Sequence, residues 1–225
     1  MQYTLKRSRR KTIAIHITNG AVEVRAPYRA SKRDIDRFIF SKEKWIKEKL
    51  TKSADQLERR ESFNIDLDYG ATVLYRGEEY PITAKEGKRA GFDEAAFYMP
   101  PNLDAEQVKK TCVHIYRMLA KNDLTERVSY FAKLMSVSPT AVKINSAKTR
   151  WGSCSAKKSL NFSWRLVMAD DGVIDYVVVH ELAHITEMNH SQRFWAIVED
   201  VLPDYKERQK RLKQLQHRLS GEDWG

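Results

Sequence analysis

Cysteine and long apolar stretches are both scarce in this chain of 225 residues. Cys112 and Cys154, its only cysteines, are too few for a disulfide framework and too isolated for a zinc site made of thiolates. No stretch approaches the roughly 18 apolar residues of a membrane span, and the N-terminus lacks the apolar segment of a secretory signal. We therefore expect a cytoplasmic protein of a reducing compartment, without a membrane partner.

Acidic residues are outnumbered, since 30 Asp and Glu stand against 40 Lys and Arg and the formal net charge is +10. Such a charge attracts polyanions, so a nucleotide or a nucleic acid is a candidate partner. The basic residues concentrate locally at 6–11, 42–52 and 206–218, but solvated faces of strands and helices account for such runs equally well. Charge alone therefore predicts no particular partner, while 42% hydrophobic residues predict a folded globular core.

Internal repeats and low-complexity linkers are also missing, and the N-terminal part has the patterns of a small β-rich region. Residues 12–26 alternate apolar and polar side chains around Asn19-Gly20, which predicts a β-hairpin. A capping pattern and apolar residues at helical spacing predict a helix over residues 31–50 that covers this hairpin. Alternating segments between 66 and 99 predict further strands, and Pro100-Pro101 then interrupts the pattern.

The C-terminal part has the patterns of helices around a small sheet. Apolar residues on one face predict a helix over 104–134. Residues 142–145 and 160–167 predict two strands joined across 151–159. A further helix is predicted from about Asp171, with two more near the C-terminus.

The sequence His180-Glu181-Leu182-Ala183-His184 carries the clearest chemical signal. Two histidines four residues apart project from one face of a helix, close enough to share a metal ion. Glu181 projects in another direction, but its side chain can approach that metal, where a general base for a bound water is needed. The pattern therefore predicts two zinc ligands and a catalytic carboxylate.

His190 follows the second histidine by six residues and is predicted to be the third ligand. A continuous helix would carry it about 15 Å along the axis from His180, so the helix must end in between. We expect Asn189 to end it, because Asn tolerates the left-handed conformation that commonly closes a helix. Three imidazoles leave a fourth position for water, as in a catalytic zinc site. The alternative is a buried helix whose histidines are merely hydrogen-bonded.

Three parts of the chain together resemble the YgjP-like metallopeptidase family. The first part is Arg7-Ser8-Arg9-Arg10-Lys11-Thr12-Ile13, and the second is Thr149-Arg150-Trp151-Gly152-Ser153-Cys154-Ser155. The third is Val177-Val178-Val179-His180-Glu181-Leu182-Ala183-His184 together with Asn189-His190-Ser191 and Phe194-Trp195. The resemblance implies a compact zincin related to SprT-like proteases, with one Zn²⁺ held by His180, His184 and His190 and with Glu181 in the catalytic position. Glu187 stands where metzincins, which share the histidine spacing, have glycine.

Together these patterns predict an α+β protein. A β-rich region with one or two covering helices is expected over residues 1–100. A compact zincin-like metallohydrolase domain with a small sheet and an active-site helix is expected over residues 101–225. We place the boundary near Pro100-Pro101.

The main functional hypothesis is a zinc-dependent metallopeptidase that acts on a protein or peptide through a metal-bound water activated by Glu181. Arg150, Arg165 and Tyr176 are candidates for a second oxyanion donor by proximity in sequence, each with an alternative role in packing or surface charge. The segment from Trp151 to Ser155 either forms an edge strand to which an extended substrate adds, or is a structural turn with Trp151 in the core.

Three other functions stay open at this point. The first is a metal-dependent phosphohydrolase that acts on nucleoside triphosphates, that is, a nucleotide pyrophosphatase. The positive charge would suit such a substrate, although the sequence contains no Gly-rich loop that would bind phosphate and no carboxylate-rich cluster for two metal ions. A DNA-associated protease of the SprT-like kind is the second. The third is a non-catalytic nucleic-acid-binding module that retains a metal, which the presence of Glu181 disfavours.

Overall fold

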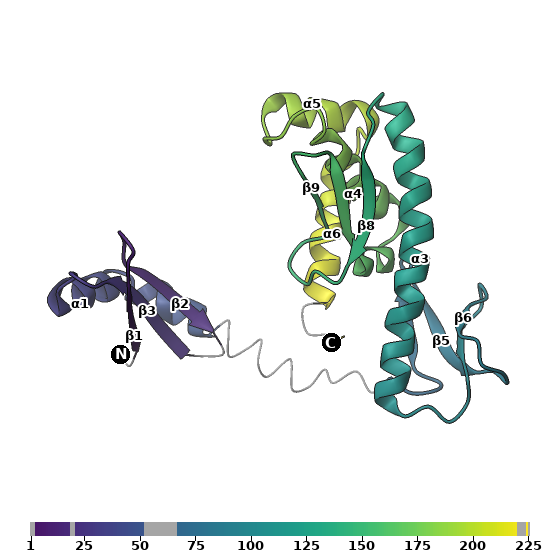
Figure 1. Ribbon diagram of the computed structural model, residues 1–225, viewed down its shortest axis with the longest axis horizontal. Coiled ribbons are helices and arrows are strands. Elements are labelled where there is room, and N and C mark those ends of the chain that lie inside the picture. Colours follow the sequence, from purple (N-terminus) through teal and green to yellow (C-terminus); the bar gives the residue numbers. More distant parts are fainter. Residues whose placement is uncertain (1–2, 19–20, 52–66, 220–223, 225) are drawn as a thin grey trace. The chain divides into compact units, whose positions relative to one another are not determined.

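The computed structural model describes residues 3–18, 21–51, 67–219 and 224, and its contacts divide into two compact units (Figure 1). The N-terminal unit comprises the described residues up to 51, and the C-terminal unit comprises residues 67–219 with Trp224. Both contain helices and strands, which confirms the predicted α+β class.

The division between the units differs from the boundary predicted at Pro100-Pro101. Strands between residues 72 and 99 belong to the C-terminal unit because they pack on its long helix. The Tyr116 hydroxyl donates a hydrogen bond to the Leu74 carbonyl at 2.6 Å, and the Tyr116 ring lies 5.1 Å from that of Phe97. A proline pair interrupts secondary structure, but it does not by itself separate hydrophobic cores.

The N-terminal unit is a three-stranded sheet covered by helix. Strands β1 (Thr4–Ser8), β2 (Ala14–Thr18) and β3 (Ala21–Pro27) lie in the order β1-β3-β2, with β1 parallel and β2 antiparallel to β3. The antiparallel pair is the predicted hairpin, although its Asn19-Gly20 turn lies outside the described residues.

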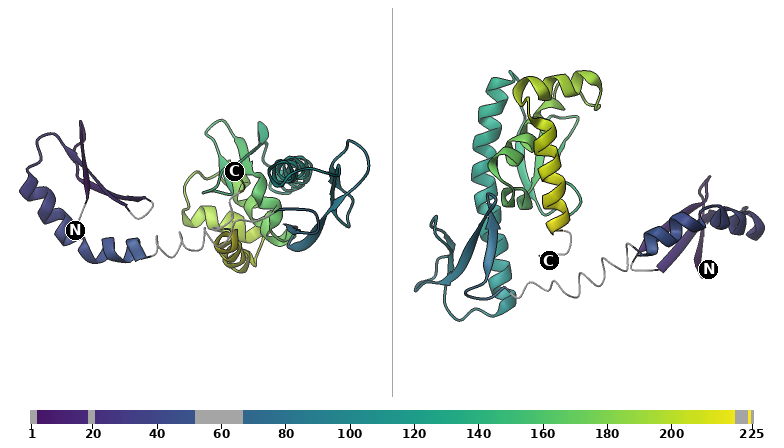
Figure 2. Two further views of the ribbon diagram at one scale, coloured as in Figure 1. Left: turned by 90° about the horizontal axis from the view of Figure 1, so that it is seen from below. Right: turned by 180° about the vertical axis from the view of Figure 1, so that it is seen from behind.

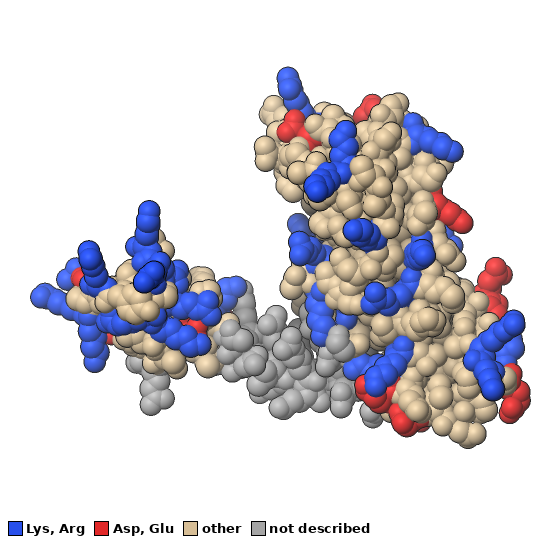
Figure 3. Space-filling model, in the orientation of Figure 1, with Lys and Arg blue, Asp and Glu red and all other residues tan. Residues whose placement is uncertain are grey.

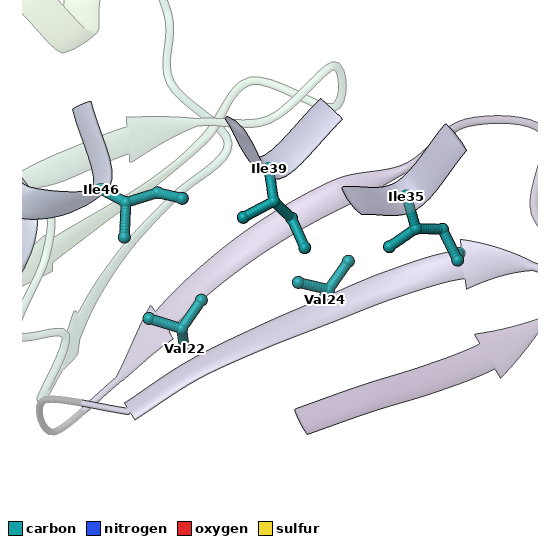
Figure 4. Packing of buried hydrophobic residues seen from close by; sticks show 6 residues of the cluster. Val22, Val24, Ile35, Ile39 and Ile46 are labelled. Atoms are coloured by element: carbon teal, nitrogen blue, oxygen red, sulfur yellow. The ribbon is translucent and has the colours of Figure 1, made fainter. Parts of the chain in front are cut away.

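Helix α1 (Lys32–Ser41) covers one face of this sheet, and residues 43–51 are also helical. Val22 and Val24 from β3 pack against Ile35, Ile39 and Ile46 from the helical residues (Figure 4). The alternation along β3 and the helical spacing of the isoleucines therefore close a small core, as the sequence predicted.

The first sheet of the C-terminal unit has the strand order β4-β5-β7-β6. Its strands are β4 (Thr72–Tyr75), β5 (Glu78–Ala84), β6 (Gly91–Phe92) and β7 (Phe97–Met99). Strands β4 and β5 form a hairpin, and β5 runs parallel to β7. Arg76 and Gly77 turn this hairpin with φ of 50° and 85°, as a two-residue turn of the primed type requires.

Helix α3 (Ala105–Leu134) is long enough to serve both sheets of this unit (Figures 1 and 2). Thirty residues span about 45 Å. Asp104 begins the helix with a capping box to Gln107. One part of α3 contacts β7, and another contacts β8 of the second sheet.

The second sheet has the order β8-β10-β9, so β9 lies at its edge. Its strands are β8 (Ala141–Asn145), β9 (Gly152–Cys154) and β10 (Ser159–Ser163), with β8 parallel and β9 antiparallel to β10. The strand predicted over 160–167 is too long. From Trp164 to Met168 the chain forms the buried 3₁₀ helix η1, because a short apolar run suits a buried helical turn as well as a strand.

Helix α4 (Asp171–Ala183) lies at the centre of the C-terminal unit and contacts α3, α5 (Gln192–Val201), α6 (Tyr205–Leu219) and β9. Most of its residues are apolar and buried, as expected of a helix surrounded by other elements. No helix within the described ranges is both long and apolar enough to cross a membrane.

Candidate metal centre

Three imidazole rings converge where α4 ends. His180 lies in the last turn of α4, His184 directly follows the helix, and His190 lies in the loop before α5. The Nε2 atoms of His180 and His190 are 3.0 Å apart. Each of the three residues offers one ring nitrogen within 4.8 Å of the others. The structure therefore brings together the three histidines that the sequence pattern selected.

The prediction that Asn189 ends this helix was wrong. Helix α4 ends at Ala183, and the next residues form tight turns in which the amides of Ile185 and Thr186 donate to the carbonyls of Leu182 and Ala183. Asn189 is not among the described residues with positive φ. Consecutive turns reverse the chain here, so no left-handed residue is needed to return His190 to the helix.

Hydrogen bonding orients the ring of His184. Its Nδ1 lies 3.2 Å from the Glu187 carbonyl oxygen, which can only accept, so Nδ1 carries the proton. The lone pair of Nε2 is then available to a metal. Burial lowers the pKa of His184, although hydrogen bonds to backbone carbonyls oppose the shift. The neutral form that metal binding needs is therefore favoured.

His180 is the most deeply placed of the three rings. Burial, assisted by the two neighbouring histidines, lowers its pKa to about 3. Its Nδ1 is buried and has no hydrogen-bond partner among the described residues. Ring nitrogens so close together fit a shared cation, because two ligands of a tetrahedral zinc lie about 3.3–3.4 Å apart when the Zn–N bonds are about 2.0–2.1 Å.

Two aromatic residues of α5 complete the surroundings of the histidines. The Phe194 ring is fully buried, with its centroid 4.6–4.9 Å from those of His180, His184 and His190. Trp195 stacks on His190, with ring centroids 5.7 Å apart. Both aromatics are part of the family resemblance in the sequence, where no role at the site was predicted for them.

A signal for this placement was present in the sequence. Ser191 follows the third histidine directly, and its side chain accepts a hydrogen bond from the Phe194 amide at 3.3 Å. This cap starts α5 beside His190 and turns Phe194 toward the rings. A capping serine directly after a ligand thus indicates which apolar residue of the next helix packs against the histidine rings.

Glu181 is buried between α4 and the edge strand β9, with a relative exposure of 6%. Its carboxylate accepts a hydrogen bond from the Cys154 backbone amide. Burial raises the pKa of Glu181 to about 7, against the opposing effect of that amide. A carboxyl group with such a pKa can exchange a proton near neutral pH, as a general base must.

Gly152 is the point of closest approach between β9 and Glu181. A Cβ atom at this position would lie 2.6 Å from Glu181 Oε1 and 2.6 Å from its Cγ. Any other residue would therefore displace the carboxylate. Neither Gly152 nor the Cys154 amide could be assigned to the site from spacing alone, because the contact joins segments about 30 residues apart.

The other predicted site residues have different surroundings. Tyr176 lies one turn before His180, with ring centroids 5.8 Å apart, and its hydroxyl accepts a hydrogen bond from Gln209 Nε2 at 3.2 Å. Arg150 is exposed just before β9, and Trp151 is half-buried. Arg165 is buried and donates to the Ser146 carbonyl at 3.2 Å.

A histidine-lined helix end with a buried glutamate beside an edge strand is the arrangement of a metal-dependent hydrolase. Comparison with protein families gives the particular class. The model described as "YgjP-like, metallopeptidase domain" matches residues 11–215, and the chain belongs to this family. The resemblance seen in the sequence is thereby confirmed.

Two solved structures, both of metallopeptidase zymogens, have partial similarity to the chain. The metallopeptidase zymogen abylysin of Pyrococcus abyssi is 23% identical, with a TM-score of 0.38 over 40% of this chain and 92% of its own. The zymogen jannalysin of Methanocaldococcus jannaschii is 21% identical, with a TM-score of 0.37 over 40% of this chain and 94% of its own. No curated protein matches the chain.

Proposed function

We propose that this protein is a zinc-dependent peptidase in which Glu181 is the general base. The observation that carries the proposal is the convergence of three imidazoles beside one buried carboxylate. His180, His184 and His190 would hold the ion through ring nitrogens that lie within 4.8 Å of one another. When bound, zinc supplies Lewis acidity, which lowers the pKa of water and stabilises negative charge on a carbonyl oxygen.

Glu181 would move the proton in this reaction. Its carboxylate accepts a proton from the attacking water and later passes it to the amine that leaves the cleaved peptide bond. The Cys154 amide holds the carboxylate against β9, and Gly152 leaves the space for it. The pKa of about 7 lets the same group accept and return a proton at neutral pH.

The open edge of β9 would bind the substrate. An extended peptide can add to an edge strand through backbone hydrogen bonds, which positions its carbonyl groups without selecting their side chains. Arg150 and Trp151 flank β9 and would contact that peptide. The Tyr176 hydroxyl accepts from Gln209, so its own proton is available for an oxyanion. We assign the buried Arg165 to packing, because its guanidinium already donates to Ser146 and lies 4.4 Å from the Trp164 ring.

A phosphohydrolase is the less favoured alternative. Two-metal phosphoryl transfer uses clustered carboxylates. Within the part of the chain that the structure describes, the three histidines form the sole group of three or more potential metal ligands. This composition favours a single ion and a peptide substrate.

Glu181→Gln tests the proposal, with Glu199→Gln on the exposed face of α5 as the matched control. We expect about one zinc per chain in all three proteins, and hydrolysis of an unfolded protein by wild type and Glu199→Gln alone. Assays run with and without DNA, and against nucleoside triphosphates, separate the alternatives. If protein purified without chelator contains no metal, the zinc site is contradicted. If wild type and Glu199→Gln hydrolyse nucleoside triphosphates and Glu181→Gln does not, the peptidase assignment is contradicted.

A further inference from the structure

The net charge of this protein is distributed unevenly along the chain. Residues 3–51 contain 14 Lys and Arg but 5 Asp and Glu, a net charge of +9. Residues 67–219 contain 23 Lys and Arg and 19 Asp and Glu, a net charge of +4 over three times the length. Figure 3 shows the side chains of Lys and Arg crowding the visible face of the N-terminal unit, with few acidic neighbours.

Ion pairs neutralise part of the positive charge in both units and leave the rest unpaired. In the C-terminal unit, arginines bridge helices: Arg127 reaches Asp123 and Asp175, and Arg211 reaches Asp170 at 2.7 Å. In the N-terminal unit, several exposed cations make no ion pair with any described acidic residue. They include Arg29, Lys32, Arg33, Lys42 and Lys44. Their charge is therefore available to an external anion.

Four exposed residues of the N-terminal unit form a row along its helical segment, which we call the outer stripe: Arg33, Arg37, Phe40 and Lys44. Arg33, Arg37 and Phe40, spaced by four and three residues, lie on one face of α1, and Lys44 follows in the helical residues after the turn at Lys42. Ile35 and Ile39 face the sheet instead (Figure 4). The outer stripe is thus the face of the helix opposite to the small core.

Phe40 is the unusual member of this row. Its relative exposure of 76% is the highest among the large apolar side chains of the described residues. Arg37 precedes it by less than one turn and forms an exposed ion pair with Asp34, at 3.9 Å. An exposed ring between cations provides a stacking surface together with phosphate-binding groups, the combination that binds single-stranded nucleic acid.

We propose that the outer stripe binds single-stranded nucleic acid. Arg33, Arg37 and Lys44 would contact phosphates, and Phe40 would stack on a base. A membrane surface fits this helix less well, because an interfacial helix must bury its apolar face in lipid. The apolar face of α1 is already buried against β3.

The test measures how the full-length chain binds a fluorescent oligothymidylate of about 20 nucleotides. Fluorescence anisotropy follows the binding over a range of salt concentrations. Wild type is expected to bind with an affinity that falls with salt. Arg33→Gln/Arg37→Gln should bind more weakly, with a log–log salt slope shallower by about 1.4, because two phosphate contacts are lost. Phe40→Ala should bind at least about five-fold more weakly with an unchanged slope.

Lys121→Gln/Lys133→Gln, which neutralises two exposed cations of α3, is the matched control and should bind like wild type. An equal loss in this control would mean that net charge alone attracts the strand, and would overturn the proposal. Binding to phosphatidylserine vesicles without binding to the oligonucleotide would also overturn it. Glu181→Gln should bind the strand normally, so the result is independent of the peptidase assignment. Circular dichroism of each variant verifies folding.

Discussion

Gly152 is the residue on which the position of Glu181 depends most directly. The glutamate is fixed to α4 by its backbone, and its carboxylate reaches β9 only because position 152 has no side chain. The same contact places the carboxylate on the Cys154 amide. One absent methyl group thus determines where the proposed general base lies.

Gly152→Ala is expected to lower kcat/KM for a peptide substrate at least about 100-fold, because displacing a catalytic group by about 1 Å has effects of this size. Zinc content should not change, since the three atoms nearest to the added methyl group all belong to Glu181. Ser153→Ala, on the neighbouring residue, is the control and should keep most of the activity. Near-normal activity of Gly152→Ala would show that hydrolysis does not need the carboxylate in this position.

At this scale, the sequence predicted the residues whose spacing is itself the signal. His180, Glu181 and His184 share one helical turn, so helix geometry alone relates them. The surroundings were not predictable in this way, because Phe194 and Gly152 reach the site through tertiary contacts. Asn189 was predicted wrongly because a helix can also be ended by successive right-handed turns.

Helix α4 is held at its N-terminal half by charged side chains from its neighbours. Arg127 of α3 binds Asp171 and Asp175 of α4 as well as Asp123 of its own helix. Arg208 of α6 donates to the Gly172 carbonyl at 3.0 Å. These contacts fix the start of the helix whose other end carries the histidines.

Arg127→Met is expected to lower the free energy of unfolding by about 3 kcal/mol at neutral pH, because it leaves partly buried carboxylates without their cation. Lys121→Met, on an exposed position of the same helix, should change it by less than about 0.5 kcal/mol. Chemical denaturation monitored by circular dichroism measures both. Equal effects of the two substitutions would contradict a specific role of Arg127.

The same network predicts a dependence on pH. Burial raises the pKa of Asp171, but hydrogen bonding from Arg76 and the charge of Arg127 outweigh it, and the net pKa is lowered. A carboxylate with a lowered folded-state pKa stabilises above its unfolded value of about 3.9, and this contribution is lost as the pH falls through the folded value. The difference between wild type and Arg127→Met should therefore shrink below about pH 4.

The elements themselves were predicted best where one periodicity runs unbroken. The helix predicted over 104–134 is α3 within one residue, because its apolar face continues through thirty residues. The apolar run 160–167 divides between β10 and η1, since no period distinguishes a buried strand from a buried turn. The grouping of β4–β7 with α3 depended on contacts such as that between Tyr116 and Leu74, which no local pattern contains.

The whole molecule combines two units with separate hydrophobic cores. The N-terminal unit buries a cluster of six apolar residues between its sheet and helix. The C-terminal unit has a much larger core around α3 and α4. Small units bury a smaller fraction of their surface and are less stable, so the two cores should differ in stability.

We therefore expect two unfolding transitions, of which the N-terminal unit gives the one at lower temperature. Zinc should raise the temperature of the upper transition alone. A ligand that binds only the folded histidine site stabilises the folded C-terminal unit by about 4 kcal/mol when its concentration is 1,000 times its Kd. Calorimetry with and without a chelator measures the shift, and hydrogen exchange of peptides from residues 21–51 and 171–201 assigns each transition. Since the metal would join the end of α4 to the loop before α5, peptides from the histidine segment should lose protection on chelation while those from the N-terminal unit keep theirs. A single transition that moves as a whole with zinc would instead show that the two cores unfold together.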